Sequence, residues 1–499
     1  MTKVSIAHRA PRRQAAGEPA AVPRAGSGAH LRATLSQPWD VVIIGGGNAG
    51  LVSALSARAS GASVLVLERA PLVLRGGNSR HTRNIRCVHD QADRYYTGSY
   101  SYDEMWRDLC SVGKGPNNEE LAALTLAEST SLPTWMTERG VNWQASLTGT
   151  LQLGRTNRFF LGGGKALLNT YYRAAREMGI HVLYDASVEA VNFCGDRCVS
   201  LTVQSGGSQL QVSPQAIVCA SGGFEANVEW LEKYWGQAAR NYHIRGPVYN
   251  DGTVLRSLLD SGAASAGDER GFHAVAVDAR SPRFDGGIAT RIDSIPFGVT
   301  VDRSGRRFYD EGEDIWPKRY AIWGGNIARQ EDQIAYSLWD AKVSGLFLPP
   351  MYGAYKADSI SALAALLDLN ADQVSETIRR YNAATPDDAT ARFNPALPDG
   401  VTTSGLFLPK SNWAQPLDTP PFYAVPMRPG VTFTYLGVEI NRDSRIIRTD
   451  GTYFKNVFAA GEMMSGNILS TGYLAGFGLT IGTVWGRIAG REAARHALR

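Results

Sequence analysis

The sequence has few cysteines, and they follow no disulfide or metal-ligand pattern. The five cysteines are an odd number and include no C-x-x-C pair, so neither a disulfide framework nor an iron–sulfur site is predicted. No set of His, Asp or Glu residues has metal-ligand spacing, and no G-x-S-x-G segment is present. We therefore expect no metal site and no serine nucleophile, and we expect reduced thiols, as in a cytoplasmic protein.

Long apolar runs and a strong excess of one charge are also absent. No stretch reaches the roughly 18 to 20 apolar residues that span a bilayer, so no transmembrane segment is predicted. The net charge is only +4 over 499 residues, and several arginines fall within residues 1–39, so nucleic acid is not an expected partner. A composition of 44% hydrophobic and 20% charged residues is typical of a globular enzyme, and this length favours two domains with a cleft between them.

A glycine-rich loop near the start of the chain is the most informative local motif. After an aperiodic segment, 1–39, which we expect to be a disordered extension, an apolar run leads into Gly45-x-Gly47-x-x-Gly50. A small-residue helix and a second apolar strand follow, and that strand ends at Glu68. This strand–turn–helix–strand unit is a dinucleotide-binding fingerprint, in which glycines allow the tight turn, the approach to the pyrophosphate and close helix packing. The acidic residue is placed to accept hydrogen bonds from an adenosine ribose and would repel a 2′-phosphate.

Two further segments favour FAD over a nicotinamide cofactor. Gly76-Gly77-Asn78-Ser79 directly follows the second strand, and a late strand ends in Ala459-Ala460-Gly461-Glu462. With the glycine loop, they resemble the flavoprotein subunits of the fumarate reductase and succinate dehydrogenase family, in which such segments contact FAD, and the likeness covers residues 40–499. Glu462 is similar to the ribityl-binding glutamate of that family. The expected FAD-binding residues are Gly45, Gly47, Asn48, Ala49, Gly50, Glu68, Arg69, Gly77, Asn78, Ser79, His81, Thr82, Val188, Ala220, Gly222, Gly461, Glu462, Gly478 and Leu479.

The predicted fold is α/β, with a Rossmann-like FAD-binding domain that is interrupted by an α+β capping domain. We expect the FAD-binding domain at 40–240 and 411–499, and the capping, substrate-binding domain at 241–410. Apolar runs predict strands at 180–184 and 198–212 in a small β element, further strands at 215–219 and 456–460, and helices at 359–367 and 478–494.

The family resemblance also implies an activity, the dehydrogenation of a CH–CH bond. Segments 81–87, 155–157, 162–167, 307–324 and 461–464 are most similar to members that oxidise tricarballylate to cis-aconitate. Such a reaction needs the carboxylate beside the reacting carbon to be neutralised as charge develops. Arginine does this well because its planar guanidinium binds a carboxylate bidentately, although a single arginine is more often a surface or ion-paired residue. The expected substrate-binding residues are Arg83, Arg155, Arg158, Arg245 and Arg291.

Two residues are candidates for the proton acceptor. Arg319 follows Arg307-Phe308-x-x-Glu311, which is similar to the signature that leads to the family's proton-transferring arginine, but a short insertion leaves Lys318 as an alternative position. A guanidinium acts as a base only where burial and nearby positive charge favour its neutral form. The second candidate, Tyr473, stands where fumarate reductases carry a substrate-binding arginine and is similar to a tyrosine of ketosteroid dehydrogenases.

Three histidines keep two interpretations each. His81 lies near the position at which membrane-bound succinate dehydrogenases attach FAD covalently, so covalent and non-covalent binding both remain open. His243 and His273, in the expected capping domain, are as consistent with a structural role as with substrate contact. Two alternatives also remain for the whole protein: a ketosteroid- or cyclohexanone-type desaturase, and the flavin component of a cobalamin-biosynthesis-type system.

The route by which electrons leave the flavin is expected to involve another protein. The segment Gly162-Gly163-Gly164 lacks the third glycine and the preceding strand of a second dinucleotide loop, and no cysteine cluster or haem-attachment motif is present. Electrons must therefore pass to a separate acceptor or to oxygen, and the resemblance implies a membrane iron–sulfur/cytochrome partner. We expect a cytoplasmic protein that is peripheral to the inner membrane through that partner.

Overall fold

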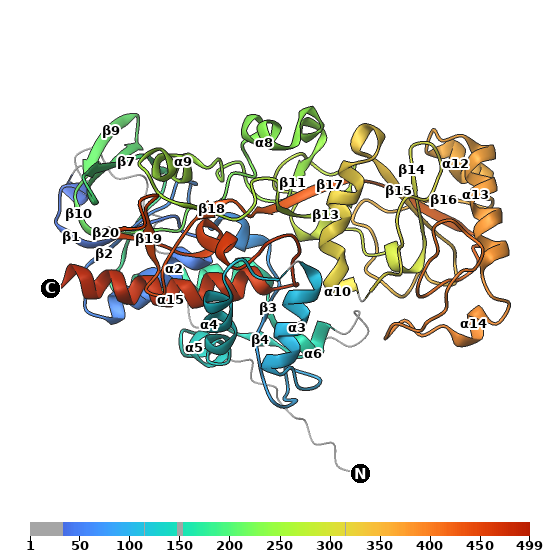
Figure 1. Ribbon diagram of the computed structural model, residues 1–499, viewed down its shortest axis with the longest axis horizontal. Coiled ribbons are helices and arrows are strands. Elements are labelled where there is room, and N and C mark those ends of the chain that lie inside the picture. Colours follow the sequence, from blue (N-terminus) through green and yellow to red (C-terminus); the bar gives the residue numbers. More distant parts are fainter. Residues whose placement is uncertain (1–32, 114, 147–152, 315) are drawn as a thin grey trace, which may run out of the picture.

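The computed structural model describes residues 33–113, 115–146, 153–314 and 316–499. Figure 1 shows an elongated molecule, with the N-terminal strands and the C-terminal helix in one lobe and α12 and α13 in the other. The predicted extension at 1–39 lies, up to residue 32, outside the described residues. Its last residues belong to the fold, because Leu35 and Trp39 are buried and the first strand begins at Trp39.

A six-stranded sheet forms the core of the first lobe, in the order β19-β20-β10-β1-β2-β6. All neighbours pair in parallel except the edge strand β19, which is antiparallel to β20. The apolar runs predicted as strands supply the buried centre of this sheet, as is usual where both faces of a parallel sheet are covered. The strands are β1 (Trp39–Ile44), β2 (Val64–Leu67), β6 (His181–Leu183), β10 (Pro214–Cys219), β19 (Arg445–Ile447) and β20 (Tyr453–Ala459).

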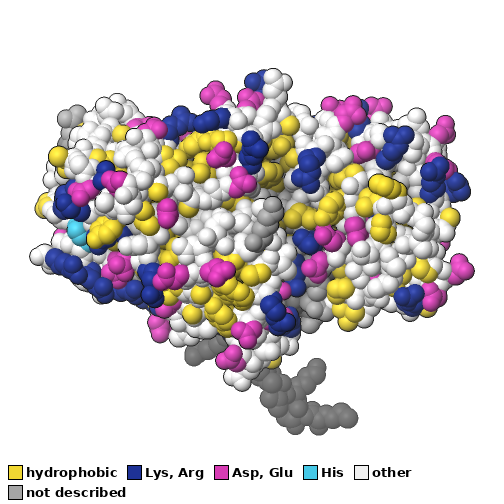
Figure 2. Space-filling view, in the orientation of Figure 1, with side chains coloured by type: hydrophobic (Ala, Val, Ile, Leu, Met, Phe, Trp, Pro, Cys, Tyr) yellow, Lys and Arg dark blue, Asp and Glu magenta, His cyan; other side chains and the backbone are white. Residues whose placement is uncertain are grey.

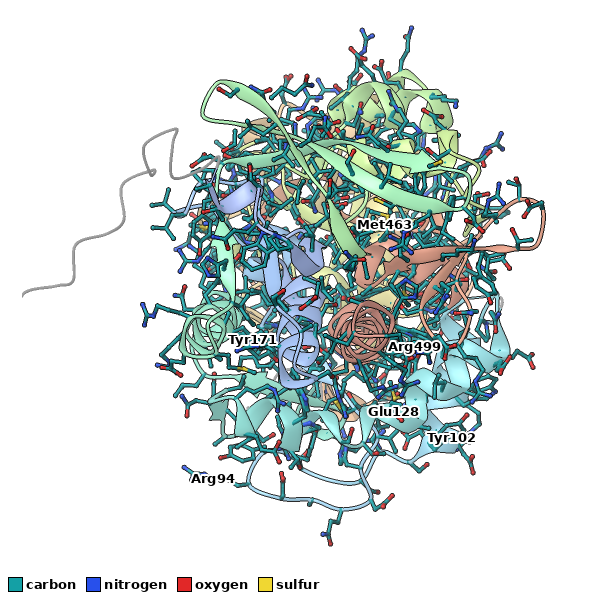
Figure 3. All side chains as sticks on the ribbon, turned by 90° about the vertical axis from the view of Figure 1, so that its left-hand side faces the viewer. Arg94, Tyr102, Glu128, Tyr171, Met463 and Arg499 are labelled. Atoms are coloured by element: carbon teal, nitrogen blue, oxygen red, sulfur yellow. The ribbon has the colours of Figure 1, made fainter. Side chains whose placement is uncertain are left out.

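Helices α2 (Asn48–Ala59) and α15 (Phe477–Ala497) lie side by side against this sheet, and Figure 3 shows them close to end-on. Glycine permits this close approach. A Cβ atom at Gly486 would lie 2.8 Å from the Ala49 carbonyl oxygen, and one at Gly490 would lie 2.2 Å from the Ser53 carbonyl oxygen. The two ends of the chain therefore form one FAD-binding unit, as the interrupted-domain prediction requires.

The small β element differs from the prediction. β6 joins the edge of the main sheet beside β2, while β7 (Ala186–Cys194), β8 (Arg197–Ser205) and β9 (Ser208–Val212) form a separate antiparallel sheet. The chain changes sheet at Asp185, which has a φ of 53°, in the left-handed region that aspartate tolerates better than most residues.

The second lobe is built on a sheet with the order β11-β17-β15-β14, in which β13 and β16 also pair with β17. The strands are β11 (His243–Ile244), β13 (Phe272–Asp278), β14 (Val299–Asp302), β15 (Ala335–Trp339), β16 (Tyr355–Ala357) and β17 (Phe422–Thr434). β17 pairs with four strands of this capping sheet although it lies beyond the expected limit at residue 410. The same long strand leads the chain back toward the FAD-binding unit (Figure 1).

The remaining elements complete the two lobes. In the first lobe and between the lobes lie β3 (Asn84–Arg86), α3 (Tyr102–Val112), α4 (Glu119–Ser129), α5 (Leu132–Glu138), β4 (Trp143–Gln144), α6 (Leu153–Thr156), β5 (Asn157–Phe160), α7 (Gly163–Glu177), α8 (Val228–Trp235), α9 (Thr253–Asp260), β12 (Ser265–Ala266) and β18 (Gly437–Val438). In the second lobe lie α10 (Trp316–Arg319), α11 (Trp323–Ala328), α12 (Ile360–Leu366), α13 (Ala371–Ala384) and α14 (Ala389–Arg392).

The surface carries no large field of one charge on the face that Figure 2 shows, where basic and acidic side chains are interspersed. This distribution agrees with the small net charge of the chain. Among the helices of the described residues, none combines the length and the apolar character needed to cross a membrane.

Candidate functional site

A large pocket lies where the loops that follow β1, β2, β10 and β20 meet residues of the capping sheet. It encloses about 1550 Å³, part of which is open to solvent. Of the expected FAD-binding residues, all except Gly50 line it. The pocket therefore gathers segments that lie hundreds of residues apart in the sequence, at the carboxyl edge of the parallel strands, where α/β folds bind nucleotides.

The packing around the first loop shows which of its glycines the fold itself requires. A Cβ at Gly50 would lie 1.9 Å from the Gly45 carbonyl oxygen, and one at Gly45 would lie 2.5 Å from the Ala220 carbonyl oxygen. At Gly47, by contrast, the nearest atom would be 3.6 Å away, so the protein alone does not require glycine there. A bound pyrophosphate that approaches the backbone would require it. The loop therefore fits the cofactor that the sequence predicts.

Glu68 holds this loop in place as well as lining the pocket. One carboxylate oxygen accepts hydrogen bonds from the amides of Gly46 at 3.0 Å and Gly76 at 3.4 Å, and the other accepts one from Ala70 at 2.8 Å. Burial raises the pKa of Glu68, and these three amides oppose that shift. Because each carboxylate oxygen accepts more than one hydrogen bond, the expected contact with a ribose hydroxyl is compatible with this network.

The N-terminus of α15 also reaches the pocket. Gly476, Gly478 and Leu479 line it, and the left-handed φ of 81° at Gly476 forms the N-cap. The partial positive charge at a helix N-terminus stabilises negative charge. This end of α15 therefore provides a favourable potential for an anionic reduced flavin.

Three arginines converge at the capping side of the pocket. Arg83, Arg245 and Arg291 all line it, and all are largely buried. Arg291 forms a bidentate ion pair with Asp293, at 2.6 and 2.8 Å. Arg245 donates only to uncharged groups, the Gly287 carbonyl at 3.2 Å and the Thr432 hydroxyl at 2.9 Å.

The electrostatics of this arginine group favour an anionic ligand. Nε and Nη2 of Arg83 have no hydrogen-bond partner among the described residues. Burial, reinforced by the neighbouring Arg291, lowers the pKa of both Arg83 and Arg245 to about 10. Three guanidinium groups beside the single carboxylate of Asp293 leave an excess of two positive charges. A buried charge without a partner is costly, so this end of the pocket is suited to a dianion.

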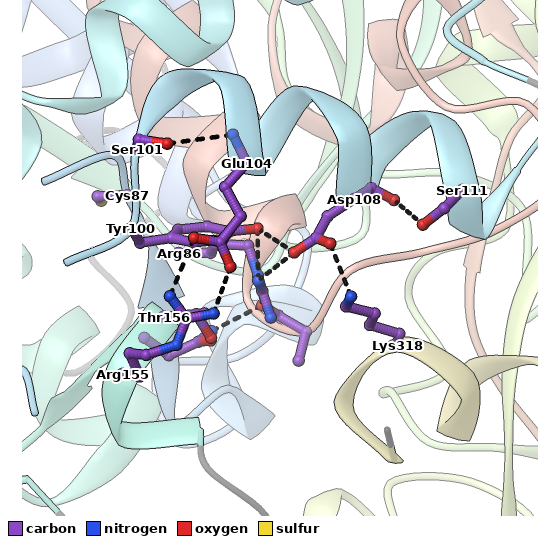
Figure 4. Close-up of polar contacts among 12 residues, drawn as sticks. Arg86, Cys87, Tyr100, Ser101, Glu104, Asp108, Ser111, Arg155, Thr156 and Lys318 are labelled. Atoms are coloured by element: carbon purple, nitrogen blue, oxygen red, sulfur yellow. Dashed lines mark hydrogen bonds and ion pairs between the residues drawn. The ribbon is translucent and has the colours of Figure 1, made fainter. Parts of the chain in front are cut away.

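The structure does not bring the other predicted arginines into this pocket. Arg155 pairs with Glu104 of α3 (Figure 4), and Arg158 pairs with Asp93. Neither lines the pocket, because each is held by a carboxylate nearer the surface. Arg319, the first candidate proton acceptor, is likewise outside the lining and pairs with Glu313 at 2.9 Å.

The segment around Arg319 nevertheless supplies a pocket residue. Lys318 of α10 forms an ion pair of 2.7 Å with Asp108 of α3 (Figure 4), and Tyr320 then lines the pocket. Asp108 also accepts a hydrogen bond from Tyr100 at 2.8 Å and lies 4.0 Å from the buried Arg86. This network anchors the capping segment to the FAD-binding unit, and Tyr320, rather than Arg319, lines the pocket.

Tyr473, the second candidate, lines the pocket within an aromatic group. Its hydroxyl oxygen accepts a hydrogen bond of 3.0 Å from the Gly478 amide. Its ring stacks on His273 with centroids 3.9 Å apart, and Tyr320 meets the same histidine edge-on at 5.5 Å. Burial raises the pKa of Tyr473 and lowers that of His273, so both side chains are neutral. In the sequence His273 is as consistent with a structural role as with substrate contact, and Tyr320 is not predicted as a site residue, because a lone aromatic residue contains no pocket signal.

His81 faces the capping domain. Its Nε2 contacts a carboxylate oxygen of Asp285 closely, and burial lowers the pKa of His81 against the opposing effect of that carboxylate. His81 lines the pocket, in agreement with its predicted place near the cofactor. His243, by contrast, is outside the lining and contacts Ser281 at 3.0 Å.

Comparison with known proteins agrees with this geometry. NADH:fumarate oxidoreductase of Klebsiella pneumoniae (strain 342) is 26% identical over 476 residues, which cover 92% of this chain and 48% of that protein, so the chain spans about half the length of this relative. The open conformation of a flavocytochrome c3 fumarate reductase superposes with a TM-score of 0.70 at 21% identity, over 95% of this chain and 81% of that one. A 3-ketosteroid-Δ4-(5α)-dehydrogenase from Rhodococcus jostii RHA1 gives 0.68 at 20% identity, over 93% and 98%. The model of the FAD binding domain family matches residues 40–479, and the chain therefore belongs to that family and takes FAD as its cofactor.

Proposed function

We propose that this protein is an FAD-dependent oxidoreductase that acts on a CH–CH bond next to a carboxylate. The observation that carries the proposal is the pair of buried guanidinium groups, Arg83 and Arg245, that line the cofactor pocket without an ion-pair partner among the described residues. The name of the Klebsiella relative, a fumarate oxidoreductase, supports the same reaction class.

The charge at the site favours a small polycarboxylate. The two excess positive charges are matched by a substrate with at least two carboxylates, each held bidentately by a guanidinium. Tricarballylate, oxidised to cis-aconitate, is our specific proposal, because two of its carboxylates match Arg83 and Arg245 and because segments 81–87 and 307–324 are similar to family members that oxidise it. A single carboxylate would leave one buried arginine unmatched, which is unfavourable.

Different residues of the pocket have separate roles in the proposed reaction. Bound FAD supplies the hydride acceptor. Arg245 and Arg291 orient the substrate and neutralise the carboxylate beside the carbon that loses its proton. Arg83 binds a second substrate carboxylate in its charged form, which, as for Arg245, prevails below a pKa of about 10, while the neutral Tyr473 donates a hydrogen bond. Of the two candidate proton acceptors from the sequence, Tyr473 lines the pocket, whereas Arg319 lies outside its lining and pairs with Glu313.

A steroid-type desaturase remains the second candidate function, on one observation. The Tyr473 hydroxyl oxygen accepts a hydrogen bond of 3.0 Å from the Gly478 amide at the pocket wall, which leaves the hydroxyl hydrogen to donate to a ketone oxygen whose negative charge grows during proton loss. The excess of positive charge argues against a neutral ketone as the main ligand.

The electrons are proposed to leave through a separate protein. The described residues contain no group of three or more His, Cys, Asp or Glu side chains that could hold a metal ion, and all five cysteines are free. A membrane-bound iron–sulfur or cytochrome partner fits both this and the flavocytochrome nature of the similar fumarate reductase.

The experiment that tests the function is anaerobic mixing of the yellow holoprotein with tricarballylate, succinate and a 3-ketosteroid, followed by flavin absorbance. We expect tricarballylate to bleach the flavin, and we expect Arg245→Met to abolish bleaching. Arg155→Met is the matched control, because it removes an arginine outside the pocket. Bleaching by the steroid alone would replace the proposal with the desaturase. Mixing the reduced protein with cis-aconitate tests the reverse direction.

A further inference from the structure

Two glutamates meet behind the cofactor pocket, and the mechanism above uses neither of them. Glu225 is fully buried, and Glu462 lines the pocket. Gly223 packs against both: a Cβ there would lie 2.3 Å from Glu462 Oε1 and 3.0 Å from Glu225 Oε2. The carboxyl groups are therefore near neighbours, with no room between them and the backbone for a larger residue at position 223.

The hydrogen-bond donors around this pair are unevenly distributed. Glu225 Oε1 accepts from the side-chain amides of Asn78 and Asn250, the latter at 2.7 Å. Glu462 Oε1 accepts from the backbone amide of Thr434 at 2.9 Å and from its hydroxyl at 3.2 Å. Glu225 Oε2 receives no hydrogen bond from any described residue. A carboxylate oxygen that is buried without a donor is unfavourable, whereas a protonated oxygen can itself donate to its neighbour.

No cation compensates the two carboxyl groups. Within the described residues, neither glutamate forms an ion pair with Lys, Arg or His. Besides burial, the charge of Glu462 also raises the pKa of the nearby Tyr473, which is neutral. Burial raises the pKa of both glutamates, and their mutual repulsion raises that of Glu462 further. Two like charges this close do not both ionise readily.

We propose that Glu225 and Glu462 share one proton in a hydrogen bond that involves Glu225 Oε2, so that the pair carries a single negative charge beside FAD. Glu225 is then a positioning residue. It does not line the pocket, and it acts by setting the protonation of Glu462, which the family resemblance places at the ribityl chain. The arriving cofactor displaces water from Glu462, which makes a second charge there less favourable, so FAD binding and retention of the proton support each other.

This proposal predicts how FAD affinity depends on pH. Above the pH at which the free protein loses the shared proton, each pH unit weakens FAD binding by up to about tenfold, which is the linkage expected for one proton. Glu225→Gln removes this dependence. Its amide oxygen still accepts from Asn78 and Asn250, and its NH2 group supplies a fixed donor toward Glu462. The effect is independent of substrate, so it stands or falls separately from the proposed function.

The test combines two measurements on full-length protein. FAD dissociation constants are measured from flavin fluorescence between pH 6 and 10 for the wild type, Glu225→Gln and the exposed control Glu229→Gln, with a rise expected for the wild type and control only. Infrared difference spectra of the holoproteins at neutral pH are expected to contain a protonated-carboxyl C=O band that Glu225→Gln removes and Glu229→Gln keeps.

Equal pH slopes in all three proteins, or no such band in the wild type, would overturn the proposal. Should Glu225→Gln not fold, loss of the same band in Glu462→Gln supports the shared proton and its persistence refutes it.

Discussion

Replacing Arg245 by Met is the change that most directly separates a ligand-binding arginine from a structural one. Arg245 is 5% exposed and lies at the capping side of the pocket. Methionine retains much of the apolar length of the side chain and removes only the charge and the donors. Loss of a binding arginine should lower substrate affinity and leave stability nearly unchanged. Loss of a structural arginine should lower stability and leave affinity nearly unchanged.

The expected magnitudes follow from the contacts of Arg245. Keeping its charge in a buried site is unfavourable by about 3 kcal/mol, since burial lowers its pKa to about 10 and one pKa unit corresponds to about 1.4 kcal/mol. Its two hydrogen bonds, to Gly287 and Thr432, each contribute about 1 kcal/mol. These terms nearly cancel, so the free energy of unfolding of the substrate-free protein should change by no more than about 1 kcal/mol. Substrate affinity, in contrast, should fall by about 3 kcal/mol, or about 150-fold, as when one member of a buried charge pair is removed.

The assay pairs urea unfolding with a substrate titration of the flavin spectrum, and Arg155→Met serves as the control with both values unchanged. Affinity should also fall as pH rises through about 10, because the charged form that binds the anion is the one populated below the pKa of Arg83 and Arg245. Over the same range the protein itself should become more stable, since deprotonation removes an unfavourable buried charge. If Arg245→Met destabilised the protein by several kcal/mol while affinity held, Arg245 would be structural and the dianion argument would be refuted.

Three other substitutions test separate parts of the site. Gly47→Ala should leave the stability of the cofactor-free protein unchanged but weaken FAD binding, whereas Gly50→Ala, with its Cβ 1.9 Å from a carbonyl oxygen, should lower the melting temperature; the reverse order would contradict the reading of this loop. Tyr473→Phe should reduce kcat by about 100-fold, the usual cost of losing one donor to a developing oxyanion, with KM and FAD content little changed; a change in KM alone would make the residue a binding group. Asp108→Asn should cost about 3 kcal/mol in thermal unfolding, because it leaves Arg86 buried without its carboxylate, and an unchanged melting temperature would argue against this network.

The cofactor half of the site could be predicted from sequence because its residues act through local rules. The glycine loop, Glu68 and the Gly76 to Ser79 segment each follow a strand of a parallel sheet, and such strands end at one edge. Most of the expected cofactor contacts there come from the backbone, so a motif of small residues is enough to predict the cofactor site. Even Gly50, which does not line the pocket, has the packing role that its position in the motif predicts.

The substrate half could be predicted only in part, because residue type does not reveal what an arginine pairs with. Arg155 and Arg245 are equally plausible in the sequence, yet the first pairs with Glu104, whereas the second forms no ion pair among the described residues. The partner of Arg155 comes from α3, which is remote from it in the chain. Burial and pairing are properties of tertiary packing, and single-residue patterns contain neither.

Glu225 is another residue whose role could not be predicted from the sequence. In the sequence it is an ordinary glutamate after Gly222-Gly223-Phe224, with no motif of its own, whereas Glu462 stands out through its family segment. The fold brings the two together because β10 and β20 are neighbours in the main sheet, so the loops after both strands enter the same corner of the pocket. A carboxyl group that is recognisable by motif thus takes its protonation state from one that is not, and the charge presented to FAD depends on strand order rather than on either motif.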